Sequence, residues 1–230
     1  MRLTRNRPSG RITAVVLLAV AMLTGCGSPG ETPSGPAPSG KPSAWTGSGV
    51  QPLVSLKAGV EDRVEPALLP KDIGMPALEA VSLDVEGLDD VASGVCGLQR
   101  GNGVYEGMFG LRRQWRGKGV AVEQFVSAFG AITATKAIDQ VKGSLACGSY
   151  RDRSGEHTEI ATHPVDRFPN IDGSAMFCET LNARQRICTV LLAREDMLSR
   201  VTVQADDHAV ASSLANSVAS RAASALEKAW

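Results

Sequence analysis

The cysteines are the feature that most constrains how this chain can fold. Five occur among its 230 residues: Cys26 directly follows an apolar segment, and Cys96, Cys147, Cys178 and Cys188 lie farther along. Disulfides form and persist in oxidising compartments and are rare where thiols are kept reduced. Whether the four later cysteines cross-link the fold therefore depends on where the chain folds, and the N-terminus bears on that question.

The N-terminus has the three parts of an export signal in the required order. Residues 1–11 hold four arginines and no acid, residues 12–23 read ITAVVLLAVAML, and small residues follow up to Cys26. A positive flank, a short apolar core and a small-residue exit are typical of a secretory signal peptide. As a helix the core would span about 18 Å, well short of a hydrocarbon layer of about 30 Å. We therefore expect residues 1–25 to be a signal peptide rather than a transmembrane helix.

The residues that close the signal, Leu23-Thr24-Gly25-Cys26, resemble the bacterial lipobox. The resemblance implies that Cys26 is diacylated and becomes the first residue of the mature protein. Two acyl chains are the number needed for stable anchoring, at about 0.8 kcal/mol per buried methylene. We expect a chain held by this diacylglyceryl anchor on the extracytoplasmic face of the cell membrane. Cleavage at an ordinary signal peptidase site is the alternative.

Composition divides the rest of the chain into a tether and a domain. Residues 26–50 are mostly Gly, Pro and Ser, which cannot bury enough apolar surface to offset the entropy of ordering, so we expect a disordered spacer. Residues 51–230 suffice for a single domain with a real core. Basic and acidic residues balance at 24 each, and aromatic residues make up only 4%. The sequence therefore predicts no nucleic-acid partner and implies no cofactor.

On the oxidising side of a membrane, the four later cysteines predict two disulfides. Four cysteines allow three pairings, and local geometry favours one pair. Strand-like residues flank a polar turn at Asn182-Ala183-Arg184, so Cys178 and Cys188 would face each other across a hairpin. Cys96 then pairs with Cys147, and closing that loop should stabilise the fold by about 4 kcal/mol. Zinc is the rival interpretation, but the chain has no C-x-x-C pair.

Hydrophobic periodicity predicts two strands, a helix, further strands and a terminal helix. Alternation over Val120–Phe129 predicts a central strand covered on one side by a helix. A helix is expected over 132–145, with Gly148 just beyond its end. The other predicted strands are Phe109–Trp115, His157–Val165, Ala175–Leu181, Arg186–Ala193 and Leu198–Gln204.

The last helix should begin at Asp206 as N-cap. Its apolar stripe is Val210, Leu214, Val218, Ala222 and Leu226. Helices grouped with runs of antiparallel strands indicate an α+β fold, and we expect an antiparallel sheet with the helices packed on one face.

The order of short motifs resembles a known family. The motifs are Leu68-Leu69-Pro70, Ile73-Gly74, Cys96, Tyr105–Gly107, Val126–Phe129, Cys147, Phe177-Cys178, Cys188 and an alanine-rich C-terminal helix. Over most of Leu68–Ala225 the chain resembles the extracellular sensor domain of PknH-type receptor Ser/Thr kinases, a domain also found in free-standing actinobacterial lipoproteins. The resemblance implies a single α+β domain with two internal disulfides, a large ligand cleft and no established catalytic residues. Many members have a tryptophan just before the helix-terminal cysteine, where this chain has Leu145-Ala146.

A search for catalytic motifs finds none: G-x-S-x-G, H-E-x-x-H, the Walker A loop and the kinase signatures are all absent from the sequence. His157, Glu159 and His163 alternate along a predicted strand and would share one face. Because the two histidines lie about 20 Å apart along a straight strand, exposed polar residues are favoured over a metal site. His208 should be exposed in the first turn of the last helix.

Two charged stretches are interpreted as solvated surface. The first is the basic stretch Arg112, Arg113, Arg116 and Lys118, for which an anionic ligand at a cleft rim is the alternative. The second is the acidic run Asp84, Glu86, Asp89 and Asp90.

Three functions remain open at this point. The favoured one is a lipid-anchored binding or sensing domain, without catalysis, for an envelope small molecule or protein. An envelope hydrolase would instead need a cluster of titratable groups in a cleft. A structural or assembly factor would need no cleft. An apolar cleft with a few polar anchors would favour the first.

Overall fold

A computed structural model describes residues 61–86, 95–98, 107–129 and 133–230. These residues belong to a unit that spans 48–230. The expected signal peptide, Cys26, the expected tether (26–50), Asp89 and Asp90 all lie outside the described residues. In the described part of the chain, no helix is long and apolar enough to cross a membrane.

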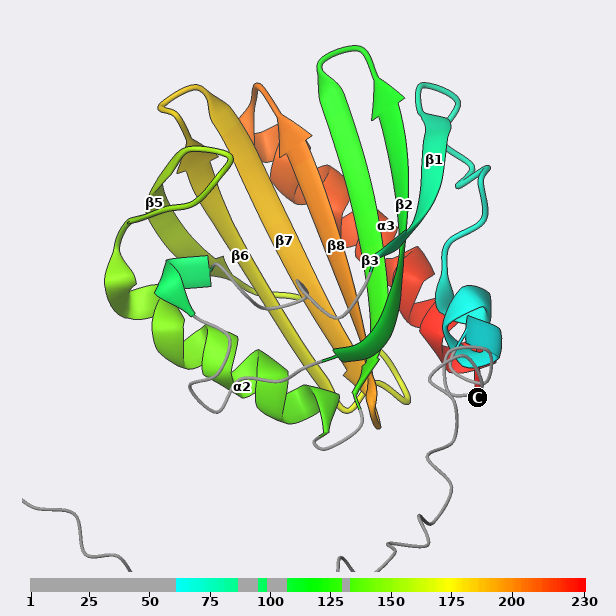
Figure 1. Cartoon of the computed structure of the whole chain (residues 1–230). Coiled ribbons are helices and arrows are strands. Elements are labelled where there is room, and N and C mark those ends of the chain that lie inside the picture. The colour runs from blue at the N-terminus through cyan, green and yellow to red at the C-terminus, as the bar shows by residue number, and fades with distance from the viewer. Residues whose placement is uncertain (1–60, 87–94, 99–106, 130–132) are drawn as a thin grey trace, which may run out of the picture. The chain divides into compact units, whose positions relative to one another are not determined.

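One open, fully antiparallel sheet of eight strands organises the described residues (Figure 1). Its spatial order is β1-β2-β3-β8-β7-β6-β5-β4. The strands are β1 Glu79–Glu86, β2 Gly107–Gly117, β3 Val120–Phe129, β4 Tyr150–Arg151, β5 Glu156–His163, β6 Gly173–Leu181, β7 Gln185–Arg194 and β8 Met197–Ala205. β3 and β8 meet at the centre and join the segment β1–β3 to the meander β4–β8.

Alternation along the central strands produces two apolar faces. Residues that lie directly opposite each other in neighbouring strands share a face of the sheet. One such row contains Val126, Ser199 and Leu192. The adjacent row, one residue along each strand, contains Phe125, Arg200 and Leu191 on the opposite face.

Two long helices cover these faces, one on each side (Figure 1). Helix α2 (Ala134–Ser144) packs Ile138 and Val141 in the same cluster as Phe125, so we name that side the α2 face. Helix α3 (His208–Lys228) shares a core with Val126, and we name that side the α3 face. The antiparallel α+β sheet with two disulfides is confirmed.

The expectation that the helices pack on one face was wrong. The physical reason lies in β3, β7 and β8, whose alternate residues are apolar on both sides, so each face needs its own cover. β3 was expected to be covered on one side, and it is central but contributes to both cores.

Helix α3 lies against the sheet mainly through alanines. Its buried residues are Ala211, Ala215, Val218, Ala219, Ala222, Ala223 and Leu226. The helix begins one residue later than the sequence indicated, because the side chain of Asp207, rather than Asp206, accepts a hydrogen bond from Val210 N at 3.0 Å. Of the predicted stripe, Val218, Ala222 and Leu226 are buried.

The described residues also include helical residues 61–64 and three short 3₁₀ turns, η1 Glu65–Ala67, η2 Val95–Gly97 and η3 Leu145–Cys147. The last of these continues α2 and ends at Gly148, whose φ of 74° lies in the left-handed region that favours glycine. The prediction that Gly148 ends this helical segment is therefore confirmed.

Both disulfides that the sequence favoured are present. Cys178 and Cys188 pair directly across the β6–β7 hairpin, with Cα atoms 4.1 Å apart. Cys96 in η2 and Cys147 in η3 have Cα atoms 5.8 Å apart, and their bond ties η2 to the end of α2. Strand β1, which includes Asp84 and Glu86, was not anticipated from the sequence.

The segment before β1 is fastened to the sheet by three polar side chains. Gln124, which is fully buried, accepts from Leu69 N at 2.7 Å and donates to the Ala67 carbonyl at 3.1 Å and to Ser199 Oγ at 3.0 Å. Arg113 donates to the Leu69 carbonyl, and Trp115 Nε1 donates to the Lys71 carbonyl at 2.8 Å. We name residues 61–78 the strap.

Replacing Gln124 by leucine should destabilise the domain by about 2–4 kcal/mol, because it leaves a buried N–H, a carbonyl and a hydroxyl without their partner. Urea unfolding measures the change. Gln185→Leu is the matched control: this glutamine is exposed, accepts only from Gln204, and should change stability by about 0.5 kcal/mol or less. Equal losses in the two variants would contradict the role assigned to Gln124.

Candidate functional site

An apolar groove of about 980 Å³ lies between the strap, the β2–β3 turn and the N-terminal half of α3. Ten of its thirteen lining residues are apolar or glycine; the other three are Lys118, Ser213 and Ser217. The full lining is Gly74, Met75, Pro76, Ala77, Leu78, Gly117, Lys118, Val120, Ala209, Val210, Ser213, Leu214 and Ser217. A volume of this size is typical of small-molecule sites.

One flank of α3 forms a wall of the groove. Val210, Ser213, Leu214 and Ser217 follow the i, i+3, i+4, i+7 spacing of a single helical stripe. Val210 and Leu214 belong to the predicted apolar stripe of this helix, but Val210 is 47% exposed and Leu214 is only partly buried. The alanine row beside them meets the sheet instead. α3 thus has two adjacent rows of small and apolar residues, one against the sheet and one along the groove. The second row is the sequence signal that could have indicated the groove.

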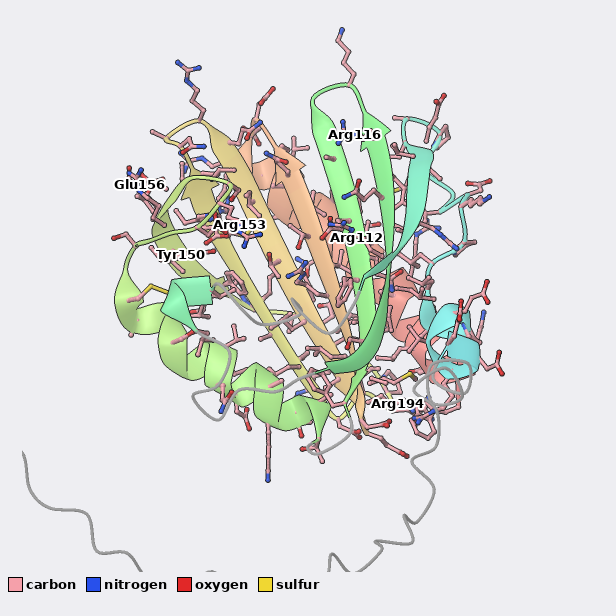
Figure 2. The ribbon with its side chains drawn as sticks, viewed as in Figure 1. Arg112, Arg116, Tyr150, Arg153, Glu156 and Arg194 are labelled. Carbon is pink, nitrogen blue, oxygen red and sulfur yellow. A yellow bond between two sulfur atoms is a disulfide. The ribbon has the colours of Figure 1, made fainter. Side chains whose placement is uncertain are left out.

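Lys118 belongs to the groove, whereas the arginines of the same basic stretch do not. β2 alternates, so Arg113 turns to the strap while Arg112 lies on the α2 face. Arg112 and Arg200 flank Glu123 at 3.5 and 3.0 Å in a half-buried ionic group. Figure 2 shows Arg112 along β2 and Arg116 nearer the β2–β3 turn. The stretch is therefore not one basic patch.

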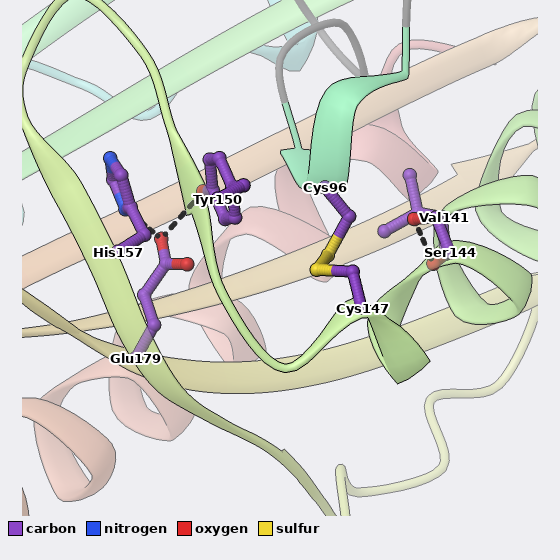
Figure 3. The surroundings of a disulfide bond; sticks show 7 residues. All are labelled: Cys96, Val141, Ser144, Cys147, Tyr150, His157 and Glu179. Carbon is purple, nitrogen blue, oxygen red and sulfur yellow. Dashed lines mark hydrogen bonds and ion pairs between the residues drawn. A yellow bond between two sulfur atoms is a disulfide. The ribbon is translucent and has the colours of Figure 1, made fainter. Parts of the chain in front are cut away.

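A second cluster lies on the α2 face beside the Cys96–Cys147 disulfide (Figure 3). His157, only 4% exposed, stacks on Tyr150 with ring centroids 4.3 Å apart. Its Nδ1 lies 3.1 Å from Glu179 Oε1, and its Nε2 lies 3.1 Å from Asp152 Oδ1. The Tyr150 hydroxyl donates to the same Glu179 oxygen at 3.1 Å. We name these four residues, with Ser154, the His157 cluster.

The two carboxylates in the His157 cluster have opposite pKa shifts. Burial raises the pKa of Glu179, and its contacts with His157 and Tyr150 oppose that rise only in part. Burial also pushes the pKa of Asp152 upward, but hydrogen bonds from Ser154 and His157 bring it below its ordinary value. Burial and the nearby Glu179 carboxylate raise the pKa of Tyr150, so its phenol remains a donor.

Ser154, His157 and Glu179 lie at distances similar to those in a Ser-His-acid catalytic triad. Ser154 Oγ lies 3.0 Å from His157 Nε2, and Glu179 stands at the other ring nitrogen. However, Ser154 Oγ donates to Asp152 at 2.6 Å, and Ser154 N and Gly155 N donate to the same carboxylate oxygen. The serine proton and the nearby backbone donors are therefore used to hold the β4–β5 turn, rather than being available for a substrate oxyanion.

His157, Glu159 and His163 do not share a face, so that expectation was wrong. The β5–β6 register shifts between Thr158 and Ala161, and Glu159 has a φ of 54°. This bulge reverses the alternation that a straight strand would have. His157 consequently lies on the α2 face, while His163 lies opposite Met176 on the α3 face.

Beyond the bulge, His163 meets the start of α3. The rings of His163 and His208 have centroids 5.2 Å apart. Nitrogen atoms of these two histidines and Cys178 Sγ all lie within 4.8 Å of one another. His208 is exposed, as expected, but its proximity to His163 could not be read from the sequence.

No protein-family model and no curated protein matches the chain. Among solved structures, the extracellular domain of PknH from Mycobacterium tuberculosis aligns with 74% of this chain and 95% of its own length, at 15% identity and a TM-score of 0.48. An uncharacterized protein from Mycobacterium smegmatis aligns with 64% of this chain and 90% of its own length, at 8% identity and a TM-score of 0.39.

Glu179→Gln should change how stability depends on pH. Because the folded-state pKa of Glu179 is raised, its favourable contribution is complete at low pH and is lost as the pH rises through that pKa. The stability of the wild type relative to the variant should therefore fall from about pH 4.5 to pH 7, as measured by urea unfolding.

Tyr150→Phe tests the same electrostatics from the donor side. It removes a hydrogen bond that lowers the pKa of Glu179, so this pKa should rise further. The stability difference between Tyr150→Phe and Tyr150→Phe/Glu179→Gln should therefore fall more with rising pH than the difference between the wild type and Glu179→Gln. A pH-independent difference in both comparisons would show that Glu179 does not titrate as its burial requires.

Proposed function

We propose that this chain is an exported, lipid-anchored binding domain, without catalysis, whose groove takes the apolar chain of an anionic amphiphile from the cell envelope. The observation that carries the proposal is the apolar groove with a single cation, Lys118, in its lining. Export and anchoring rest on residues 1–26 of the sequence. The disulfides support an oxidising location.

The lining of the groove selects the chemical class of ligand. Burying an alkyl chain against Met75, Leu78, Val210 and Leu214 removes apolar surface from water. This burial favours binding by about 25 cal/mol per Å² of apolar area. Lys118 supplies the charge that would orient a carboxylate or phosphate head, and the two serines offer hydroxyls. A site mostly apolar with a few polar anchors is the usual design of small-molecule pockets.

The His157 cluster supports catalysis less well than it supports a structural role. A general base must accept a proton from its nucleophile, but Ser154 donates to Asp152, and carboxylates stand at both nitrogens of His157. These contacts cross-link β4, β5 and β6 next to the Cys96–Cys147 disulfide. We therefore assign the cluster to stabilising this edge of the sheet.

Binding of a fluorescent fatty acid to the purified domain tests the groove. Leu214→Glu should weaken binding by about tenfold or more, because a charge then faces the alkyl chain. A tenfold rise in Kd corresponds to a loss of about 1.4 kcal/mol of binding free energy. Lys118→Glu should weaken the carboxylate probe but not a cationic amphiphile with the same chain.

Val81→Glu is the matched control, since this valine is 53% exposed and lies outside the groove lining. Its affinity should equal that of the wild type. Absence of saturable binding by the wild type, or equal weakening by Val81→Glu and Leu214→Glu, would overturn the proposed site.

The anchor has a separate test in a bacterial host that processes lipoproteins. The wild type should fractionate with membranes and carry the mass of a diacylglyceryl group at Cys26, whereas Cys26→Ser should lose the acyl mass and leave the membrane fraction. A Cys26→Ser chain that stays membrane-bound would overturn the anchoring part while leaving the groove untouched.

A further inference from the structure

We propose that, before the Cys178–Cys188 disulfide forms, Cys178, Cys188, His163 and His208 bind one Zn²⁺, so that metal binding and disulfide formation exclude each other. The donors come from three strands that follow one another in the chain, β5, β6 and β7, and from the first residue of α3, and they lie side by side on the α3 face. None of the four donors belongs to the groove lining, although His208 directly precedes Ala209 and Val210, which do.

The bulge in β5 creates the first half of the site. It brings His163 to the α3 face, where it lies diagonally across from Cys178 because Ala161 pairs with Cys178 and His163 pairs with Met176. Cys188 lies directly opposite Cys178 in the next strand. Two thiols and one imidazole are therefore presented by three adjacent strands.

The start of α3 supplies the fourth donor. His208 is its first residue, and its ring is tilted 46° to that of His163. Donor atoms of His163, His208 and Cys178 lie within 4.8 Å of one another, and Cys188 Sγ is bonded directly to Cys178 Sγ. Tetrahedral Zn²⁺, with bonds of about 2.0–2.3 Å, needs ligand atoms about 3.3–3.8 Å apart, so the donors would move closer together on binding the metal. The exposed side chain of His208 has room for such a movement.

An orphaned atom points to the same place. Among the described residues, His163 Nε2 is buried and has no hydrogen-bond partner. A buried nitrogen without a partner destabilises the fold, and a metal ion would satisfy it. With the thiols reduced, the set is Cys₂His₂, one of the usual structural zinc sets.

The zinc-bound dithiolate form and the disulfide form interconvert by a two-electron thiol–disulfide exchange. Zn²⁺ binds the thiolates and displaces their two protons. Oxidation by a protein or small-molecule disulfide removes two electrons from the two cysteines, forms the Cys178–Cys188 bond, reduces the oxidant to two thiols and releases Zn²⁺. With the disulfide formed, only the two histidines remain as ordinary ligands.

Cobalt titration of the Cys26→Ser chain, oxidised and then phosphine-reduced without oxygen, tests this inference. The reduced chain should bind one Co²⁺ with a thiolate-to-metal absorption band, at least about 100-fold more tightly than the oxidised chain. His163→Ala and His208→Ala should each weaken the reduced chain by about tenfold or more, whereas His157→Asn, on the opposite face, should not.

A variant without Cys178 and Cys188 shows which cysteine pair holds the metal. Cys178→Ala/Cys188→Ala retains Cys96 and Cys147, so a reduced variant that still binds Co²⁺ with wild-type affinity would overturn the assignment by placing the metal at the other pair. Near-ultraviolet circular dichroism checks whether the reduced chain stays folded. If it unfolds, or if the histidine variants bind as tightly as the wild type, the folded Cys₂His₂ site does not exist.

Discussion

The hydrogen bonds of the buried Gln124 amide hold the strap against the sheet, and the arrangement of the α3 face depends on them. The amide satisfies the backbone of the strap at Ala67 and Leu69 and also reaches Ser199 in the neighbouring strand. A backbone segment that crosses an apolar face must find partners for its N–H and C=O groups, and Gln124 provides them where water cannot. Because the strap also forms one wall of the groove, the same amide helps to position that wall.

Those parts of the fold that depend on local pattern could be predicted from the sequence. The β6–β7 hairpin follows from a polar turn between apolar runs, and its symmetry places Cys178 opposite Cys188. The prediction failed where tertiary contacts decide. Both helices carry an apolar stripe, but nothing local says which side of the sheet each one covers. At the bulge, Glu159 contacts Thr180 in β6 and Arg186 in β7, and a strand pattern reveals neither the bulge nor these partners.

The candidate site was the least predictable part for the same reason. Lys118 was named from its charge, but its companions in the groove come from the strap and from α3, so their meeting is a property of the whole fold. Val210 and Leu214 were predicted as part of the apolar stripe of α3, and such a stripe does not distinguish a sheet contact from a groove wall. The groove is lined by α3, whereas the His157 cluster lies on the α2 face, so the two candidate sites use different surfaces of the domain.

The seam between β3 and β8 has a consequence for how the domain is made. β1 to β3 and β4 to β8 pair with sequence neighbours, whereas β3 and β8 pair across a long stretch of chain, from Val120 with Ala205 to Ala128 with Met197. Gln124 with Ser199 and Glu123 with Arg200 both bridge that seam. Closing a long loop costs entropy before its contacts form, so we expect the two halves to become ordered early and their union to limit the folding rate. An exported chain would then remain exposed to proteases and oxidants until that single pairing is complete.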